Sequence, residues 1–167
     1  MPYLFAEAVK ATQTGVPVMR PMVMEFPDDP LCHTLDKQYM LGDSLLVAPI
    51  FNEEGNCNVY LPEGKFTNFF TGEAVEGGKL IKGNYSYMEL PVFVPENSLI
   101  AMGQDDTVDY EYHENITIRA YHVTDQTINL YDKKGTHQAK VTVKLENGEF
   151  KLTIEGNAPN ITLEVID

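Results

Sequence analysis

The chain has 167 residues, of which 43% are hydrophobic and 22% charged, and its formal net charge is -13. This composition predicts a folded globular protein with an apolar core and excludes an intrinsically disordered segment. Because nucleic acids and acidic membranes bind chiefly through clustered Lys and Arg, an acidic chain without a basic run excludes both as partners, whereas a neutral sugar is compatible with it.

The first predicted element is a helix over residues 1–11, with apolar side chains at Leu4, Phe5, Ala8 and Ala11. Thr14 and Gly15 follow it as a helix end. No capping residue comes before this helix, so it is already in progress at the first position. We therefore expect the chain to have been cut from a longer protein.

A buried strand and a second helix are predicted next. Residues 16–26 are β-branched and apolar, and residues 31–41 predict a helix capped by Asp28 or Asp29 and closed by Gly42. Helix, strand and helix alternate in α/β barrels, in which one strand needs neighbours to make a sheet. Residues 1–42 are thus predicted to be the end of a (β/α)8 catalytic barrel.

Short strands separated by Gly and Pro turns follow, which is typical of an antiparallel β-sandwich. A proximal β-sandwich is predicted over 43–116, with strands at 45–50, 58–61, 65–69, 87–90 and 99–101. A partial distal β domain is predicted over 117–167, with strands at 116–123, 139–145, 150–154 and 161–166. The Asp-rich loop 103–109 is the best candidate boundary between them, and a last strand that runs to the terminus again indicates truncation. The predicted fold class is mainly β, with an N-terminal helix-strand-helix remnant.

A set of short motifs in a fixed order resembles glycoside hydrolase family 31. They are MPYL at 1–4, GVPVMRPM at 15–22, EFPDDP at 25–30, LDKQYMLGDSLLVAP at 35–49, YLPEGKF at 60–66 and LPVFVPENS at 90–98. The Met-rich segment 19–24 and the motif at 25–30 look most like the bacterial α-xylosidase branch. The resemblance weakens after about residue 118, and Phe66 stands where the family often has Trp.

This resemblance implies a retaining exo-acting α-glycosidase, most similar to an α-xylosidase and otherwise to an α-glucosidase. Its two catalytic aspartates, about 5 Å apart across the sugar, belong to earlier barrel strands. No residue here matches those motifs, so no catalytic, cofactor-binding or metal-binding residue is assigned, and this chain alone is expected to be inactive. The expected partners are the upstream catalytic barrel of the same polypeptide and, through it, a small oligosaccharide; a homo-oligomer stays open.

Some charged residues invite a catalytic interpretation, but structural roles fit them better. Asp28 and Asp29 follow a predicted barrel strand, where catalytic groups gather, yet a helix cap is the simpler explanation. Arg20 and Glu25 lie within an apolar stretch and need partners if buried. Since they would point to opposite faces of a regular strand, we expect each to have its partner elsewhere.

Metal sites are not indicated by the remaining titratable residues. The four histidines, His33, His113, His122 and His137, lack metal-ligand spacing and are expected at the surface or core edge. Asp105, Asp106 and Asp109 lack the spacing of a calcium loop and predict a solvated loop. Cys32 and Cys57 form no paired motif and are expected to be free thiols, which favours a cytoplasmic location.

The aromatic side chains leave two interpretations open. They could form a sugar-stacking platform, or they could fill the sandwich core, which their alternation with polar residues favours. The set is Tyr60, Phe66, Phe69, Phe70, Tyr85, Tyr87 and Phe93. Beside a non-catalytic part of a glycosidase, the alternative functions are a free-standing carbohydrate-binding module and an oligomerisation module.

Overall fold

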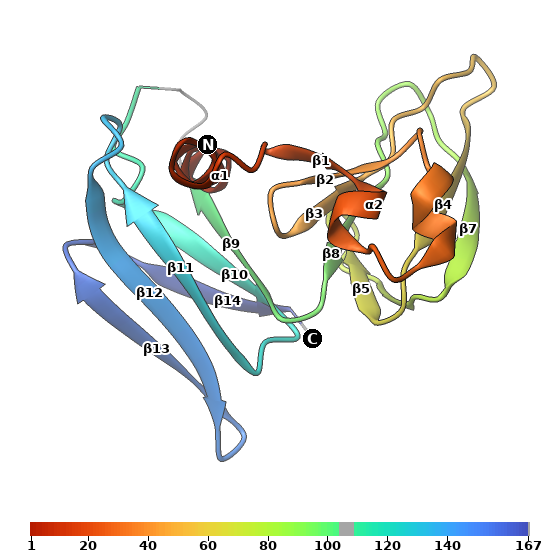
Figure 1. Ribbon diagram of the computed structural model, residues 1–167. Helices are drawn as coiled ribbons and strands as arrows, with labels where there is room; N and C mark the ends of the chain where they lie inside the picture. The colour runs from red at the N-terminus through yellow and green to blue at the C-terminus, as the bar shows by residue number, and fades with distance from the viewer. Residues whose placement is uncertain (104–108, 167) are drawn as a thin grey trace. The chain divides into compact units, whose positions relative to one another are not determined.

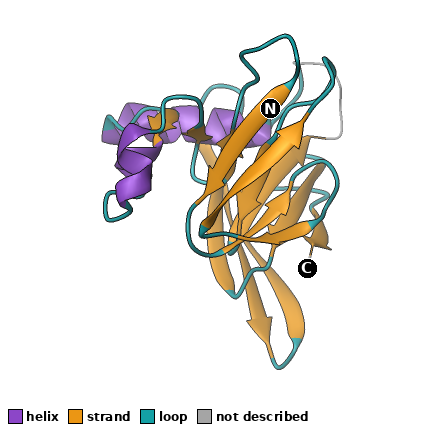
Figure 2. Ribbon diagram, turned by 90° about the vertical axis from the view of Figure 1, so that its right-hand side faces the viewer, coloured by secondary structure: helices purple, strands orange, loops and turns teal. Residues whose placement is uncertain are grey.

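The computed structural model describes residues 1–103 and 109–166, and strands dominate it (Figure 1, Figure 2). Contacts group the chain into two compact units. Residues 19–96 form one, here called the central unit, and residues 1–18 with 97–167 form the other, the terminal unit. A mainly β fold with an N-terminal helix is therefore confirmed. The division at residues 42 and 116 assigns segments to the domains of a longer enzyme and stays a prediction.

The central unit consists of two antiparallel sheets. The larger sheet has the order β1-β2-β3-β8-β5-β6 and the smaller pairs β4 with β7. The bounds are β1 (Met19–Pro21), β2 (Tyr39–Leu41), β3 (Leu45–Val47), β4 (Asn56–Leu61), β5 (Lys65–Asn68), β6 (Ala74–Glu76), β7 (Lys79–Asn84) and β8 (Val92–Pro95). Buried side chains of both sheets, among them Leu46, Val59, Leu61, Phe66 and Phe93, form one core cluster, as in a β-sandwich.

The terminal unit combines the first helix with two three-stranded sheets. One sheet has the order β14-β10-β9, in which β14 lies parallel to β10, and the other has the order β11-β12-β13. The bounds are α1 (Pro2–Thr14), β9 (Ser98–Gly103), β10 (Ile116–Tyr121), β11 (Asp125–Tyr131), β12 (His137–Glu146), β13 (Glu149–Gly156) and β14 (Thr162–Ile166). Helix α1 contacts β9 and β11, and the rings of Phe5 and Tyr112 lie 4.9 Å apart.

The segment from 16 to 42 differs from its prediction in two places. The predicted strand 16–26 is only β1, because the chain turns into the short helix α2 (Met22–Glu25). The predicted helix 31–41 is a 3-10 helix, η1 (Pro30–Thr34), after which the chain becomes extended at Leu35. Gly42, with a φ of 65°, does not close a helix but makes the turn of the hairpin β2-β3. The cross-strand pairing of Tyr39 with Val47 outweighs local helix propensity here.

Some strands of the structure have no counterpart among the strands predicted from the sequence. Strands β6, β7, β8 and β11 were not predicted, whereas the predicted strand 87–90 is a turn and loop. In β7 the polar residues and Gly83 weaken the alternation, and only pairing with β4 makes this segment a strand. The hairpin at Asn147 and Gly148 is confirmed between β12 and β13.

Candidate functional site

One concavity of the central unit is a groove between two loops, which we call the Phe51–Tyr87 groove. Its volume is about 730 Å³, within the range of small-molecule sites. The lining residues are Pro49, Ile50, Phe51, Asn52, Glu53, Gly55, Tyr85, Ser86, Tyr87, Glu89 and Leu90. They come from the loop between β3 and β4 and the loop between β7 and β8.

Backbone hydrogen bonds hold these two loops together. The N–H of Tyr85 donates to the carbonyl of Gly55 over 2.9 Å, and the N–H of Ala48 donates to the carbonyl of Pro91 over 3.1 Å. Gly55 has a φ of 74°, and a Cβ on it would meet the carbonyl oxygen of Tyr85 at 2.1 Å. Only glycine therefore permits this close approach of the two loops.

Two asparagines fix the shape of the first loop. The side-chain oxygen of Asn52 accepts from the N–H of Asn56 over 2.9 Å, and its Nδ2 donates to the Asn56 carbonyl over 2.6 Å. The Asn84 side chain donates to the side-chain oxygen of Asn56 over 3.1 Å and so ties β7 to the same loop. These hydrogen bonds thus shape the first loop and join it to the end of β7.

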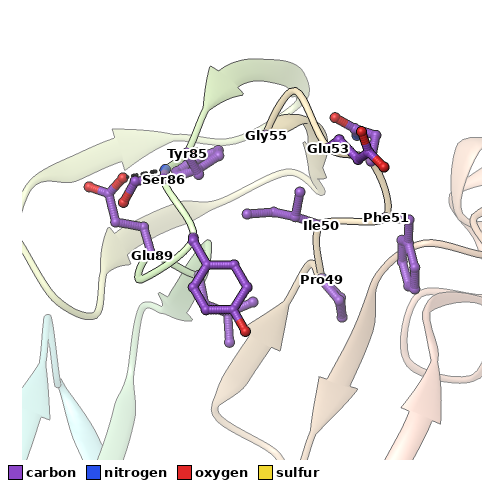
Figure 3. Close-up of a pocket in the computed structure, with 11 residues that line it drawn as sticks. Pro49, Ile50, Phe51, Glu53, Gly55, Tyr85, Ser86 and Glu89 are labelled. Atoms are coloured by element: carbon purple, nitrogen blue, oxygen red, sulfur yellow. Dashed lines mark hydrogen bonds between the residues drawn. The ribbon is translucent and has the colours of Figure 1, made fainter.

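The walls of the groove combine apolar and acidic side chains. In Figure 3, Phe51 and Glu89 lie on opposite sides of Ile50. Phe51 is 66% exposed and Tyr87 is fully exposed. The N–H of Ser86 donates to Glu89 Oε2 over 2.7 Å, and this bond lowers the pKa of the Glu89 carboxyl below its ordinary value. The groove therefore presents aromatic surface beside a carboxylate that is ionised at neutral pH.

A second concavity of the central unit, the Asp29 cleft, contains the acidic pair singled out in the sequence. Its volume is about 520 Å³, and its lining is Glu25, Phe26, Pro27, Asp28, Asp29, Pro30, Tyr60, Pro62, Glu63 and Gly78. Asp29 Oδ1 accepts from the N–H of Leu31 over 3.0 Å, which confirms it as the cap of η1. Asp29 Oδ2 accepts from the Tyr60 hydroxyl over 2.8 Å. Both carboxylate oxygens of Asp29 thus have structural partners.

The Asp29 carboxylate also affects the protons beside it. Burial, followed by the hydrogen bond to Asp29, raises the pKa of Tyr60 to about 12. Burial and the negative charge of Asp29 raise the pKa of Cys32 to about 11. Cys32 and Cys57 are both buried free thiols, as predicted. These groups stay protonated at neutral pH, which fits packing better than nucleophilic chemistry.

Arg20 and Glu25 are partners, contrary to the prediction that each pairs elsewhere. Arg20 Nε lies 2.7 Å from Glu25 Oε1, and its Nη2 lies 2.8 Å from Asp43 Oδ1. The prediction assumed a regular strand, in which residues five apart face opposite ways. Helix α2 instead turns Glu25 back toward Arg20, which is 4% exposed. A buried charge with two carboxylate partners is a structural ion pair.

The histidines and the acidic loop do not form a metal site among the described residues. His33, His122 and His137 lie at the surface or the core edge as predicted, whereas His113 is buried between Glu111 and Glu114. Asp109 forms an ion pair with Lys133 over 3.1 Å. Asp105 and Asp106 lie outside the described residues.

Within the described part of the chain, no helix is long and apolar enough to cross a membrane.

The prediction for the aromatic residues is confirmed for some and wrong for others. Tyr60, Phe66 and Phe93 are buried in the core, and Phe69 and Tyr85 are half-buried. Phe70 and Tyr87 are exposed, because their segments are turns and not strands. Strand periodicity cannot predict the direction of side chains in turns.

Sequence analysis missed two residues that shape this unit. Gln38 is buried, its Nε2 donates to the Tyr60 carbonyl over 2.7 Å, and its Oε1 accepts from the Tyr60 N–H over 2.8 Å. Gln38 therefore satisfies the backbone of β4 as a neighbouring strand would. The other is Gly55, whose contact with Tyr85 spans 30 positions of sequence. No local pattern marks either contact.

The comparisons with known proteins agree on one family. Residues 15–100 match the model of the glycosyl hydrolase family 31 C-terminal domain. The α-xylosidase XylQ of Lactiplantibacillus pentosus is 34% identical over 99% of this chain and 23% of its own length. The cycloalternan-forming enzyme of Listeria monocytogenes superposes with a TM-score of 0.84 at 30% identity, over 98% of this chain and 17% of that one. The family 31 dextranase of Flavobacterium johnsoniae, in complex with isomaltotriose, gives 0.82 at 26% identity over 98% and 23%. The chain thus spans less than a quarter of the length of these relatives.

Proposed function

We propose that this chain, which belongs to glycosyl hydrolase family 31 and carries its C-terminal domain, is the non-catalytic C-terminal part of a retaining α-glycosidase. The match over residues 15–100 carries the proposal. It is supported by larger relatives, in which the matched region occupies 23% of the α-xylosidase and 17% of the cycloalternan-forming enzyme. The upstream barrel of the same polypeptide would then supply the catalytic aspartates.

The chemistry of the described residues supports a structural role for this segment. Asp29 and the ion pair of Arg20 serve the local fold, since Asp29 caps η1 and Arg20 binds Glu25 and Asp43. A general acid needs a carboxyl positioned to protonate a leaving group, and both Asp29 oxygens are already engaged in structural hydrogen bonds. Our proposal is therefore that the segment stabilises a barrel and does not perform the hydrolysis.

We propose terminal α-linked xylose or glucose as the sugar cleaved by the longer enzyme. The identity of 34% to an α-xylosidase supports xylose first. Glucose is the second candidate, supported by an identity of 29% to an α-glucosidase of Saccharolobus solfataricus.

Two buried free thiols support the reducing cytoplasm as the location of the protein. Cell fractionation would test this location.

The test compares this chain with the full gene product that carries it. Both are assayed on p-nitrophenyl α-xyloside and p-nitrophenyl α-glucoside, and the anomer of the first product is followed by NMR. We expect the gene product to release the α-anomer, as a retaining enzyme does, and this chain to release none. Hydrolysis by this chain alone, or an inactive full gene product, would overturn the proposal.

A further inference from the structure

The Phe51–Tyr87 groove has a rigid frame, which is the first requirement of a binding site. The hydrogen bond from Tyr85 to Gly55 joins its two loops, and the bonds between Asn52 and Asn56 fix one of them. A preformed site avoids the entropic cost of ordering its loops when a ligand binds. The hydrogen bonds therefore reduce the ordering that a ligand would have to impose on the loops.

Exposed aromatic side chains at the groove carry a free energy that burial would recover. Phe51 is 66% exposed and Tyr87 is fully exposed, although burying such a ring away from water stabilises a protein. Leu90, which also lines the groove, is 40% exposed. Clustered exposed apolar side chains on a rigid surface mark an interaction site. The rings offer flat faces on which a partly apolar ligand can stack.

The polar groups of the groove define the chemistry of that ligand. Glu53 and Glu89 line it, and the pKa of Glu89 is lowered by the hydrogen bond from Ser86. Both side chains are exposed, so their free oxygens can accept hydrogen bonds from a ligand. The groove therefore suits a ligand that combines hydroxyl or amine donors with an apolar face.

A neutral sugar meets these requirements, and we favour it over a cationic ligand because of the proposed function. An anionic ligand would be repelled by the two glutamates and by the net charge of -13. A purely apolar ligand would leave the carboxylates without partners. A pyranose has C–H groups on one face, which pack on aromatic rings, and hydroxyls around its rim, which donate to carboxylates.

We infer that the Phe51–Tyr87 groove binds a neutral gluco-oligosaccharide, with Phe51 and Tyr87 as stacking platforms and Glu53 and Glu89 as hydroxyl acceptors. The choice of an α-linked glucose unit rests on the proposed function. The site itself rests on the geometry of the central unit.

Titration of the isotope-labelled chain with isomaltotriose, followed by backbone amide NMR, tests this inference. We expect shift changes confined to residues 49–55 and 85–90 with a millimolar dissociation constant, because the rings that would contact the sugar are exposed to solvent. Phe51→Ala and Tyr87→Ala should each weaken binding about tenfold. Glu89→Gln should also weaken binding, because it replaces a charged acceptor with a neutral one.

Phe70→Ala is the matched control, since Phe70 is 67% exposed but does not line the groove. It should leave the dissociation constant unchanged. Thermal unfolding of each variant verifies that the fold is retained. Absence of shift changes at tens of millimolar sugar would overturn the inference, as would equal binding by the alanine variants or binding of a Lys-rich peptide at the groove in place of the sugar.

This titration fails independently of the hydrolysis assay. If the full gene product cleaves α-glycosides but this chain binds no isomaltotriose, the groove inference fails and the proposed function stands. If the chain binds the sugar but the full gene product cleaves no α-glycoside, the proposed function fails and the groove inference stands.

Discussion

The central and terminal units are both β-rich, but they are stabilised in different ways. The terminal unit contains the longest strand, β12 with 10 residues, and its core consists of alternating apolar side chains such as Ile116 and Ile118. The central unit has strands of 3 to 6 residues. Its short strands are supplemented by buried polar contacts, such as those of Arg20 and Gln38 with residues distant in sequence.

This difference shows where a binding site can be built. Regular ladders satisfy the backbone and leave little of it available for a ligand. Loops held by side-chain and backbone hydrogen bonds expose groups in a fixed arrangement, as at the Phe51–Tyr87 groove. We therefore expect polar and glycine substitutions to dominate the behaviour of the central unit, and apolar truncations to dominate that of the terminal unit.

The largest effect is expected from Arg20→Ala in the central unit. It removes the shared partner of Glu25 and Asp43 and should lower the free energy of unfolding by roughly 3–5 kcal/mol, measured by urea denaturation. The control is Lys144→Ala in the terminal unit, where Lys144 is 46% exposed and pairs with Asp125 at 2.8 Å. That solvent-exposed pair should contribute much less to the free energy of unfolding. If both variants lowered the free energy of unfolding equally, the proposed difference between the buried ion pair of the central unit and the exposed pair of the terminal unit would be wrong.

Ile118→Ala tests the apolar core of the terminal unit. Ile118 is fully buried in the core cluster, and the cavity should lower the free energy of unfolding by about 2–5 kcal/mol. Ile154→Ala, at a position 38% exposed on β13, should cost about 1 kcal/mol or less. Urea denaturation monitored by circular dichroism measures both. A larger loss for Ile154→Ala would contradict the assignment of the core.

Tyr60→Phe tests the polar contact beneath the Asp29 cleft. Loss of the hydrogen bond to Asp29 should lower the free energy of unfolding by roughly 1.5–3 kcal/mol at neutral pH. The pKa of Tyr60 is raised from 10.0 to about 12 in the folded protein, so its contribution is complete below pH 10 and is lost as pH rises toward 12. The stability difference between wild type and Tyr60→Phe should therefore shrink over that pH window. A difference independent of pH would contradict the assignment.

Gly55→Ala tests whether the two loops of the groove need their close approach. The positive φ and the 2.1 Å clash with the Tyr85 carbonyl oxygen should together cost roughly 1–3 kcal/mol of stability. Gly72→Ala separates the two causes, because Gly72 has a φ of 74° but no described heavy atom lies within 4 Å of its added Cβ. That control should cost about 1 kcal/mol from backbone strain alone. Equal melting temperatures for the two variants would show that the clash is relieved.

The smallest effect on stability is expected from the aromatic walls of the groove. Phe51→Ala and Tyr87→Ala remove exposed side chains and should change the free energy of unfolding by about 0.5 kcal/mol or less. Their effect should be confined to sugar binding. A large decrease in the free energy of unfolding would show that these rings contribute to the core and would contradict their placement at the exposed walls of the groove.

Much of the terminal unit was predictable from sequence, and less of the central unit was. Helix α1, the hairpin at Asn147 and Gly148, and strands β10, β12, β13 and β14 follow local periodicity and turn chemistry. The segment 31–41 was assigned to the wrong element because its extended end is fixed by pairing with β3. The sequence does not predict the groove as a site, although it leaves Tyr85 and Tyr87 open as part of a sugar-stacking platform. Their position outside a regular strand was the missing information.

The sequence by itself determined that this acidic chain is a mainly β protein with a helix at its start, and its ordered motifs placed it in a glycosidase family. Only the tertiary structure decided that Arg20 pairs with Glu25, that Gln38 binds the backbone at Tyr60, and that Gly55 contacts Tyr85. The physical reason is the sequence separation over which each kind of interaction acts. Hydrophobic periodicity and turn propensity act over neighbouring residues, whereas these contacts form where the chain departs from regular geometry or where segments far apart in sequence meet.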